Sequence, residues 1–89
     1  SLFQPMAFIY PQSQARISLP KQMDGKPGEV TFELAHSEQN VIVYWHLDDE
    51  YITHTSNFHK LSLAPEKGKH SLTVVDDSGQ TLSTVFYIE

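Results

Sequence analysis

Apolar and polar residues alternate along most of this chain, with the period of two that is typical of β-strands with one buried face. Between residues 30 and 34, for example, the large apolar side chains are Val30, Phe32 and Leu34. β-Branched and aromatic residues, which favour strands, are common in the same segments. The pattern predicts strands at residues 7–10, 16–19, 30–34, 41–47, 51–55, 58–63, 70–75 and 81–88.

Turn-forming residues separate these segments. Residues 65–68 contain Pro-Glu-Lys-Gly, and residues 76–79 contain Asp-Asp-Ser-Gly. Because Pro removes a donor from the strand ladder and Gly adopts positive φ, we expect a loop at the first and a turn with left-handed Gly79 at the second. Asp48 and Asp49 are the expected central residues of a two-residue hairpin turn.

The number of strands predicts an all-β fold, an immunoglobulin-like antiparallel β-sandwich of seven to eight strands. Within residues 41–47 the odd positions are strongly apolar. We therefore place Trp45 in the core and Tyr44 and His46 on the outer face. The alternative is a small β-barrel such as an oligonucleotide-binding fold, which is less favoured because this chain lacks a basic surface.

Composition narrows the classes of partner. The 89 residues carry a formal net charge of −5, and the six Lys and Arg residues are scattered. Nucleic acids and anionic membrane surfaces bind clustered cations, so neither is an expected partner. No apolar run approaches the ~20 residues that cross a bilayer, so we expect no direct membrane insertion by these residues. Cysteine is absent, which excludes thiolate chemistry here.

Several motifs resemble those of one known family. The most specific is Tyr-Trp-His-Leu-Asp at residues 44–48, and Gly-Lys-His follows at residues 68–70. Together with Ile-Tyr-Pro at residues 9–11, their order and spacing resemble the C-terminal family of 1C-type penicillin-binding proteins over nearly the whole chain. The family usually has Gly in the hairpin turn where this chain has Asp49.

Members of that family are bifunctional peptidoglycan synthases, with a membrane anchor, a glycosyltransferase domain and a serine transpeptidase domain. The resemblance implies that residues 1–89 form a single C-terminal accessory domain of a larger protein. This domain would lie in the periplasm, and the parent protein would be anchored in the inner membrane. No acyl-serine motif of the transpeptidase is present, so we expect no catalytic residue.

The resemblance implies a role in cell-wall biogenesis through protein interaction. The domain would pack on the transpeptidase domain of the same chain or bind a periplasmic protein partner. An alternative is a carbohydrate-binding module that contacts the glycan strands of peptidoglycan. A self-standing hydrolase is the weakest hypothesis, because the acidic residues 48–50 and 76–77 are interpreted as solvated turns and not as paired carboxylates that flank a cleft.

Five histidines raise the question of a metal site: His36, His46, His54, His59 and His70. In a two-residue turn at residues 48–49, cross-strand partners have numbers that sum to 97. His46 then faces Tyr51 on the outer face, whereas His54 shares the face of Trp45. These two cannot hold one ion, and no helical His pair or thiol pair is present. We expect no metal and no cofactor.

The outer face of the predicted hairpin is the candidate interaction surface. Exposed aromatic groups can stack on sugars or anchor a protein partner. The same cross-strand pairs can also serve only to stabilise the sheet. The expected surface residues are Tyr44, His46, Tyr51 and Thr53.

Overall fold

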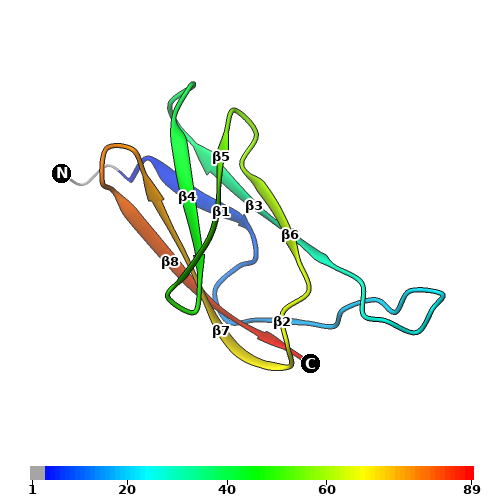
Figure 1. Cartoon of the computed structure of the whole chain (residues 1–89). Helices are drawn as coiled ribbons and strands as arrows, with labels where there is room; N and C mark the ends of the chain where they lie inside the picture. Colours follow the sequence, from blue (N-terminus) through cyan, green and yellow to red (C-terminus); the bar gives the residue numbers. More distant parts are fainter. Residues whose placement is uncertain (1–3) are drawn as a thin grey trace.

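Alternating apolar residues fold into strands along most of the described chain. The computed structural model describes residues 4–89, which form eight strands and no helix (Figure 1). The strands are β1 (Met6–Tyr10), β2 (Ala15–Ile17), β3 (Val30–His36), β4 (Ile42–Leu47), β5 (Glu50–Ser56), β6 (Lys60–Leu63), β7 (Gly68–Asp76) and β8 (Thr81–Ile88).

The strands form two sheets that face each other. One has the order β1-β3-β6 and the other has the order β2-β8-β7-β4-β5 (Figure 1). The predicted all-β sandwich is therefore confirmed. All neighbouring strands are antiparallel except β2, which runs parallel to β8. This one parallel pair arises because the chain leaves β1 in the smaller sheet and crosses to the edge of the larger sheet.

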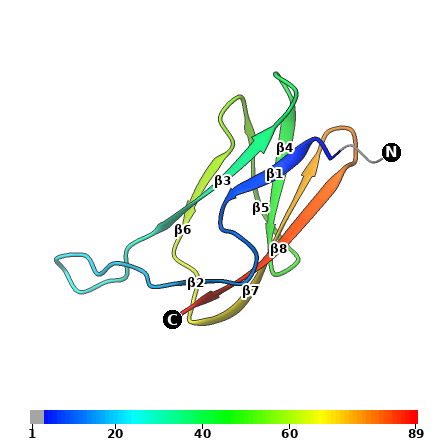
Figure 2. The same cartoon turned by 180° about the vertical axis from the view of Figure 1, so that it is seen from behind.

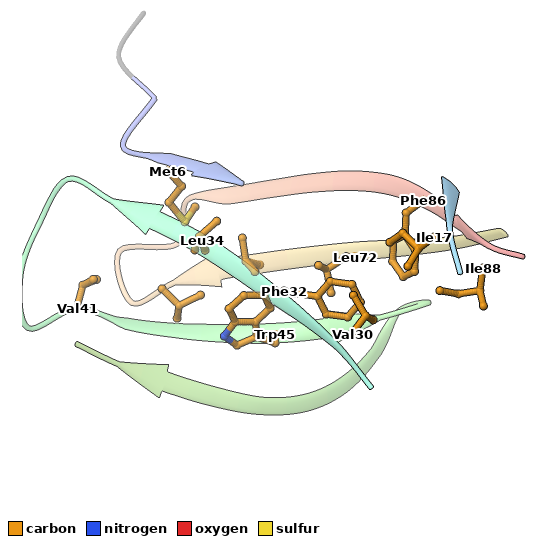
Figure 3. Close-up of a cluster of buried hydrophobic side chains, with 12 residues drawn as sticks. Met6, Ile17, Val30, Phe32, Leu34, Val41, Trp45, Leu72, Phe86 and Ile88 are labelled. Atoms are coloured by element: carbon orange, nitrogen blue, oxygen red, sulfur yellow. The ribbon is translucent and has the colours of Figure 1, made fainter. Parts of the chain in front are cut away.

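The core lies between the two sheets. Figure 3 shows Phe32 from β3 directed toward Trp45 of β4 and Leu72 of β7, and all three side chains are fully buried. The rings of Phe32 and Phe86 pack with centroids 5.2 Å apart. The prediction that Trp45 lies in the core is confirmed.

The β4–β5 hairpin has the predicted turn. Asp48 and Asp49 have φ values of 51° and 67°, so both adopt the left-handed conformation that a two-residue hairpin turn requires. Leu47 pairs with Glu50, and His46 pairs with Tyr51, as the sum of 97 predicts.

Beyond Tyr51 the predicted register is wrong. The next pairs are Trp45 with Thr53 and Tyr44 with His54, so Ile52 is an extra residue in β5. Such a β-bulge moves every later side chain of the strand to the opposite face. Thr53 therefore shares the inner face with Trp45 and does not lie beside Tyr44. His54, which was expected on the face of Trp45, takes that place.

Two further expectations are corrected. Asp76 is not a solvated turn residue, because it is only 4% exposed and its carboxylate accepts hydrogen bonds from the backbone N–H groups of Ser78 and Gln80. The strand expected from Phe58 begins only at Lys60, and the Phe58 side chain is 82% exposed in the preceding loop.

The connection between β2 and β3 projects from the sandwich as a long loop, which Figure 2 shows extending away from both sheets. An isolated bridge between Lys21 and Pro27 closes this loop. Met23 lies within it and is fully exposed.

Candidate functional site

The outer face of β4 and β5 carries four rings that contact one another. Tyr44 and His46 come from β4, and Tyr51 and His54 come from β5. Ring centroids are 6.4 Å apart for Tyr44 and Tyr51, 6.0 Å for Tyr44 and His54, and 5.7 Å for His46 and Tyr51. We call these four residues the aromatic face.

The aromatic face combines apolar area with hydrogen-bonding groups. Tyr44 is 36% exposed and Tyr51 is 53% exposed. The Tyr51 hydroxyl lies 3.2 Å from Nδ1 of His54. Amphipathic aromatic side chains of this kind are common anchors in protein interfaces.

His46 is the most covered member of the aromatic face. Its Nδ1 atom is buried, and within residues 4–89 it has no hydrogen-bond partner. An unpaired buried ring nitrogen is costly. Its partner on β7 is Thr73, whose hydroxyl bonds to the Ser83 hydroxyl at 2.8 Å, so the polar part of the outer face continues across the sheet.

A charged pair ties the tip of the hairpin to β7. Oδ2 of Asp48 lies 2.6 Å from Nδ1 of His70, and Oδ1 of Asp48 accepts a hydrogen bond from the backbone N–H of Ser71. Nε2 of His70 lies 2.6 Å from the carbonyl oxygen of Glu66. Because both ring nitrogens face oxygen acceptors, both must donate, and this requires the imidazolium form.

The pKa values of this pair shift in the directions that the geometry requires. Burial alone would lower the pKa of His70, but its hydrogen bonds to Glu66 and Asp48 and the Asp48 charge raise it above 6.5. Burial raises the pKa of Asp48, yet the Ser71 N–H and His70 lower it overall. Asp48 lies in an exposed turn, as expected, and it also has a partner on β7, which was not expected.

The described residues hold no group of three or more His, Cys, Asp or Glu side chains arranged to bind a metal ion. His36 ends β3, and His59 lies in the loop just before β6. Their ring centroids are 6.4 Å apart. His36 is engaged elsewhere, because its Nε2 donates to Asp76 and its Nδ1 accepts from the backbone N–H of Glu38.

Comparison with protein-family models gives a match over residues 2–86 to the Penicillin-Binding Protein C-terminus Family. The chain belongs to this family. No curated protein and no solved structure shows a significant match. In the part of the chain that the structure describes, no helix is long and apolar enough to cross a membrane.

The structure explains why two of the motifs that resemble the penicillin-binding protein family occur together. The Tyr-Trp-His-Leu-Asp motif ends at Asp48, and the Gly-Lys-His motif ends at His70. These two terminal residues form the ion pair between the hairpin and β7. Within the first motif, Trp45 fills the core while Tyr44 and His46 form part of the aromatic face.

Sequence reasoning missed one member of the aromatic face, His54, and included Thr53 in its place. The residue types alone could not correct this, because Thr and His both occur on either face of a strand. A clue was present in the need of the buried Trp45 indole for an acceptor. Its Nε1 donates to Oγ1 of Thr55 at 2.9 Å, which is possible only if Thr55, and not His54, points inward.

Proposed function

We propose that this chain is a non-catalytic accessory domain of a 1C-type penicillin-binding protein, and that it binds a protein through the aromatic face. The partner is the transpeptidase domain of the same polypeptide or another protein of the periplasm. The parent protein is a bifunctional peptidoglycan synthase anchored in the inner membrane. Family membership supports the accessory role, and the four contacting rings support the surface.

The aromatic face carries this proposal because it has the composition of an interface centre. Interface hot spots are enriched in Tyr, Trp and Arg, and charged residues are depleted there. A partner that covers Tyr44 and Tyr51 also covers the half-buried His46 ring, which packs edge-on against Tyr51. The net charge of −5 favours a partner with a neutral or basic patch.

The test replaces both tyrosines in the full-length protein. Tyr44→Ala with Tyr51→Ala should reduce cross-linking to the partner at least tenfold, since a hot-spot tyrosine contributes about 2 kcal/mol or more. Penicillin acylation should remain, because the proposed domain does no chemistry. Met23→Ala, which removes an exposed apolar side chain from the projecting loop, is the matched control. Unchanged cross-linking in the double variant would contradict the proposal.

The second candidate is a carbohydrate-binding module in which Tyr44 and Tyr51 stack on glycan strands. Their exposure is the observation that favours it. Sedimentation with purified sacculi separates the two functions. Wild-type protein that pellets, with the double tyrosine variant left in solution, supports glycan binding by the aromatic face. Failure to pellet at any ionic strength excludes it.

A further inference from the structure

A pocket lies at the end of the sandwich opposite the β4–β5 turn. The loop between β3 and β4 and the loop between β5 and β6 lie side by side there in both views (Figures 1 and 2). They border a half-open pocket of about 420 Å³, within the roughly 300–1,000 Å³ typical of small-molecule sites. Its lining is Leu34, Ala35, His36, Glu38, Gln39, Asn40, Asn57 and His59.

The lining is rich in neutral polar groups. Gln39, Asn40 and Asn57 supply three carboxamides, each of which both donates and accepts hydrogen bonds. Glu38 supplies one carboxylate, and no Lys or Arg is present in the lining. A phosphate or carboxylate ligand would meet repulsion here, whereas hydroxyl groups, which also donate and accept, would find partners.

His59 gives the pocket a buried polar group of defined orientation. The residue is 7% exposed, and its Nδ1 lies 2.8 Å from Oγ1 of Thr55. Because Thr55 accepts from the Trp45 indole, its own hydroxyl proton is free to donate to Nδ1 of His59. Nε2 of the neutral ring then carries the proton and is available as a donor to a ligand.

Burial supports the neutral form of His59. It lowers the pKa of His59, and the nearby His36 ring lowers it further, so the ring stays neutral near pH 7. A neutral donor suits a neutral ligand.

The loop that carries Asn57 is held in a strained conformation. Asn57 has φ of 70°, and the N–H of Phe58 donates to the carbonyl oxygen of Ser56. This is a γ-turn with positive φ at its centre, a rare and costly form. Backbone strain of this kind is concentrated at binding and catalytic sites. Phe58 lies between Asn57 and His59 in the sequence, but its side chain is 82% exposed and is not part of the pocket lining.

We propose that this pocket binds a neutral saccharide unit, held by the carboxamides of Asn40 and Asn57 and the Nε2–H of His59. Carboxamides both donate and accept hydrogen bonds, as the hydroxyl groups of a sugar do. The lining has a single carboxylate, so it lacks the pair that glycoside hydrolysis requires. The site therefore binds and does not cleave.

This inference is independent of the aromatic face. The pocket residues come from the end of β3, the loop that follows it and the loop that follows β5, whereas the aromatic face lies on the outer side of β4 and β5. Either proposal can be wrong while the other holds.

The Trp45 side chain provides a measurement of saccharide binding. The chain has one Trp, so its indole N–H gives a single resonance in a ¹H–¹⁵N correlation spectrum. Hydrogen bonds in a chain polarise one another, so a ligand that engages His59 should shift this resonance through Thr55. We expect saturable shifts of the indole and of residues 38–40 and 57–59 on titration with N-acetylglucosamine or its tetrasaccharide.

Glycerol and triglycine are the control probes. Equal shifts with glycerol would show general polyol contact, and shifts with triglycine alone would show a peptide site. Either result overturns the saccharide assignment, and so does the absence of a saturable sugar shift up to the solubility limit.

Two variants test the residues. Asn40→Gly and Asn57→Gly each remove one carboxamide but keep a residue that accepts the positive φ of these positions. Each should weaken sugar binding about fivefold to tenfold, as expected for the loss of one hydrogen bond. Tyr51→Ala should bind as wild type. Loss of binding in Tyr51→Ala with full binding in Asn57→Gly would move the sugar to the aromatic face and overturn the proposal.

Discussion

At the residue scale, the two central residues of the β4–β5 turn have different roles. Both adopt positive φ, which costs an ordinary residue about 1–2 kcal/mol and Asp somewhat less. Asp48 offsets its cost, because its carboxylate accepts hydrogen bonds from His70 and Ser71. Asp49 is exposed and follows Asp48 directly, so its negative charge adds repulsion at the tip.

We predict that Asp49→Gly stabilises the domain by about 0.5–1 kcal/mol, because Gly accepts positive φ without strain. For a domain of this size the shift in Tm would be about 2–8 °C. Thermal unfolding followed by the fluorescence of Trp45 measures it. Asp49→Ala, which also removes the charge but keeps a Cβ, should destabilise. A stabilising Ala variant would show that charge, and not backbone strain, controls the turn.

At the element scale, the bulge in β5 solves a problem that Trp45 creates. A buried indole N–H needs an acceptor. If the register of the turn continued unbroken, Ile52 and His54 would face inward on β5 and Thr55 would face outward. The extra residue at Ile52 turns Thr55 inward, where its hydroxyl accepts from the indole.

The strands and the core were predictable, but this bulge was not. Alternating apolar residues in β3 and β4 settle which faces are buried, so Phe32 and Trp45 fall in the core as expected. Residues 51–55 contain Tyr-Ile-Thr-His-Thr, which lacks a one-sided apolar pattern. Register is weakly specified in such a strand. It is decided instead by the distant indole.

The proposed saccharide pocket and the aromatic face also differ in how far the sequence predicts them. Three of the four rings of the aromatic face follow from local register near the turn. The pocket lies where the loop before β4 meets the loop after β5, and the pairing of Ile42 with Ser56 at the open end of the hairpin brings these loops together. That pairing lies beyond the bulge in β5, so the register of the turn does not predict it. No local pattern predicts that Asn40 and Asn57 meet around His59.

The hairpin and β7 are also joined through the ion pair of Asp48 and His70, and this makes their association depend on pH. The pKa of His70 is raised above its unfolded value of 6.5. The protonated ring therefore stabilises the fold fully below pH 6.5, and this contribution is lost as pH rises through the folded pKa. The Asp48 side chain is 48% exposed, so solvent screening reduces the effect.

We predict that His70→Gln removes this dependence. The free energy of unfolding of the wild type minus that of the variant should fall as pH rises above 6.5. Below pH 6.5 it should be constant until the acid range in which Asp48 takes up a proton and the ion pair is lost. The lowered pKa of His59 makes stability rise with pH. This effect is the same in the wild type and in His70→Gln, so it cancels in the difference. Urea unfolding at several pH values, with NMR titration of the histidine rings, makes the measurement. A difference that grows with pH would contradict the ion pair.

At the scale of the whole molecule, a buried polar contact joins the two sheets. His36 belongs to β3 in the smaller sheet, and Asp76 belongs to β7 in the larger sheet. Nε2 of His36 donates to Oδ2 of Asp76 at 3.0 Å, and both side chains are almost fully buried. Burial raises the pKa of Asp76, but the hydrogen bonds from His36, Gln80 and Ser78 lower it overall.

Asp76→Ala should therefore destabilise the sandwich by about 3 kcal/mol. The buried His36 loses its acceptor, which costs about 1–3 kcal/mol, and the exposed residues Ser78 and Gln80 each lose a hydrogen bond worth about 0.5–1.5 kcal/mol. The neighbouring Asp77 accepts only one exposed hydrogen bond, from the N–H of Ile42, so Asp77→Ala should cost under about 1 kcal/mol. Urea unfolding of both variants gives the comparison. Since a domain of this length is stable by only about 4–13 kcal/mol, the loss at Asp76 would leave a fold close to its limit. Equal losses at the two positions would mean that apolar packing alone holds the sheets together.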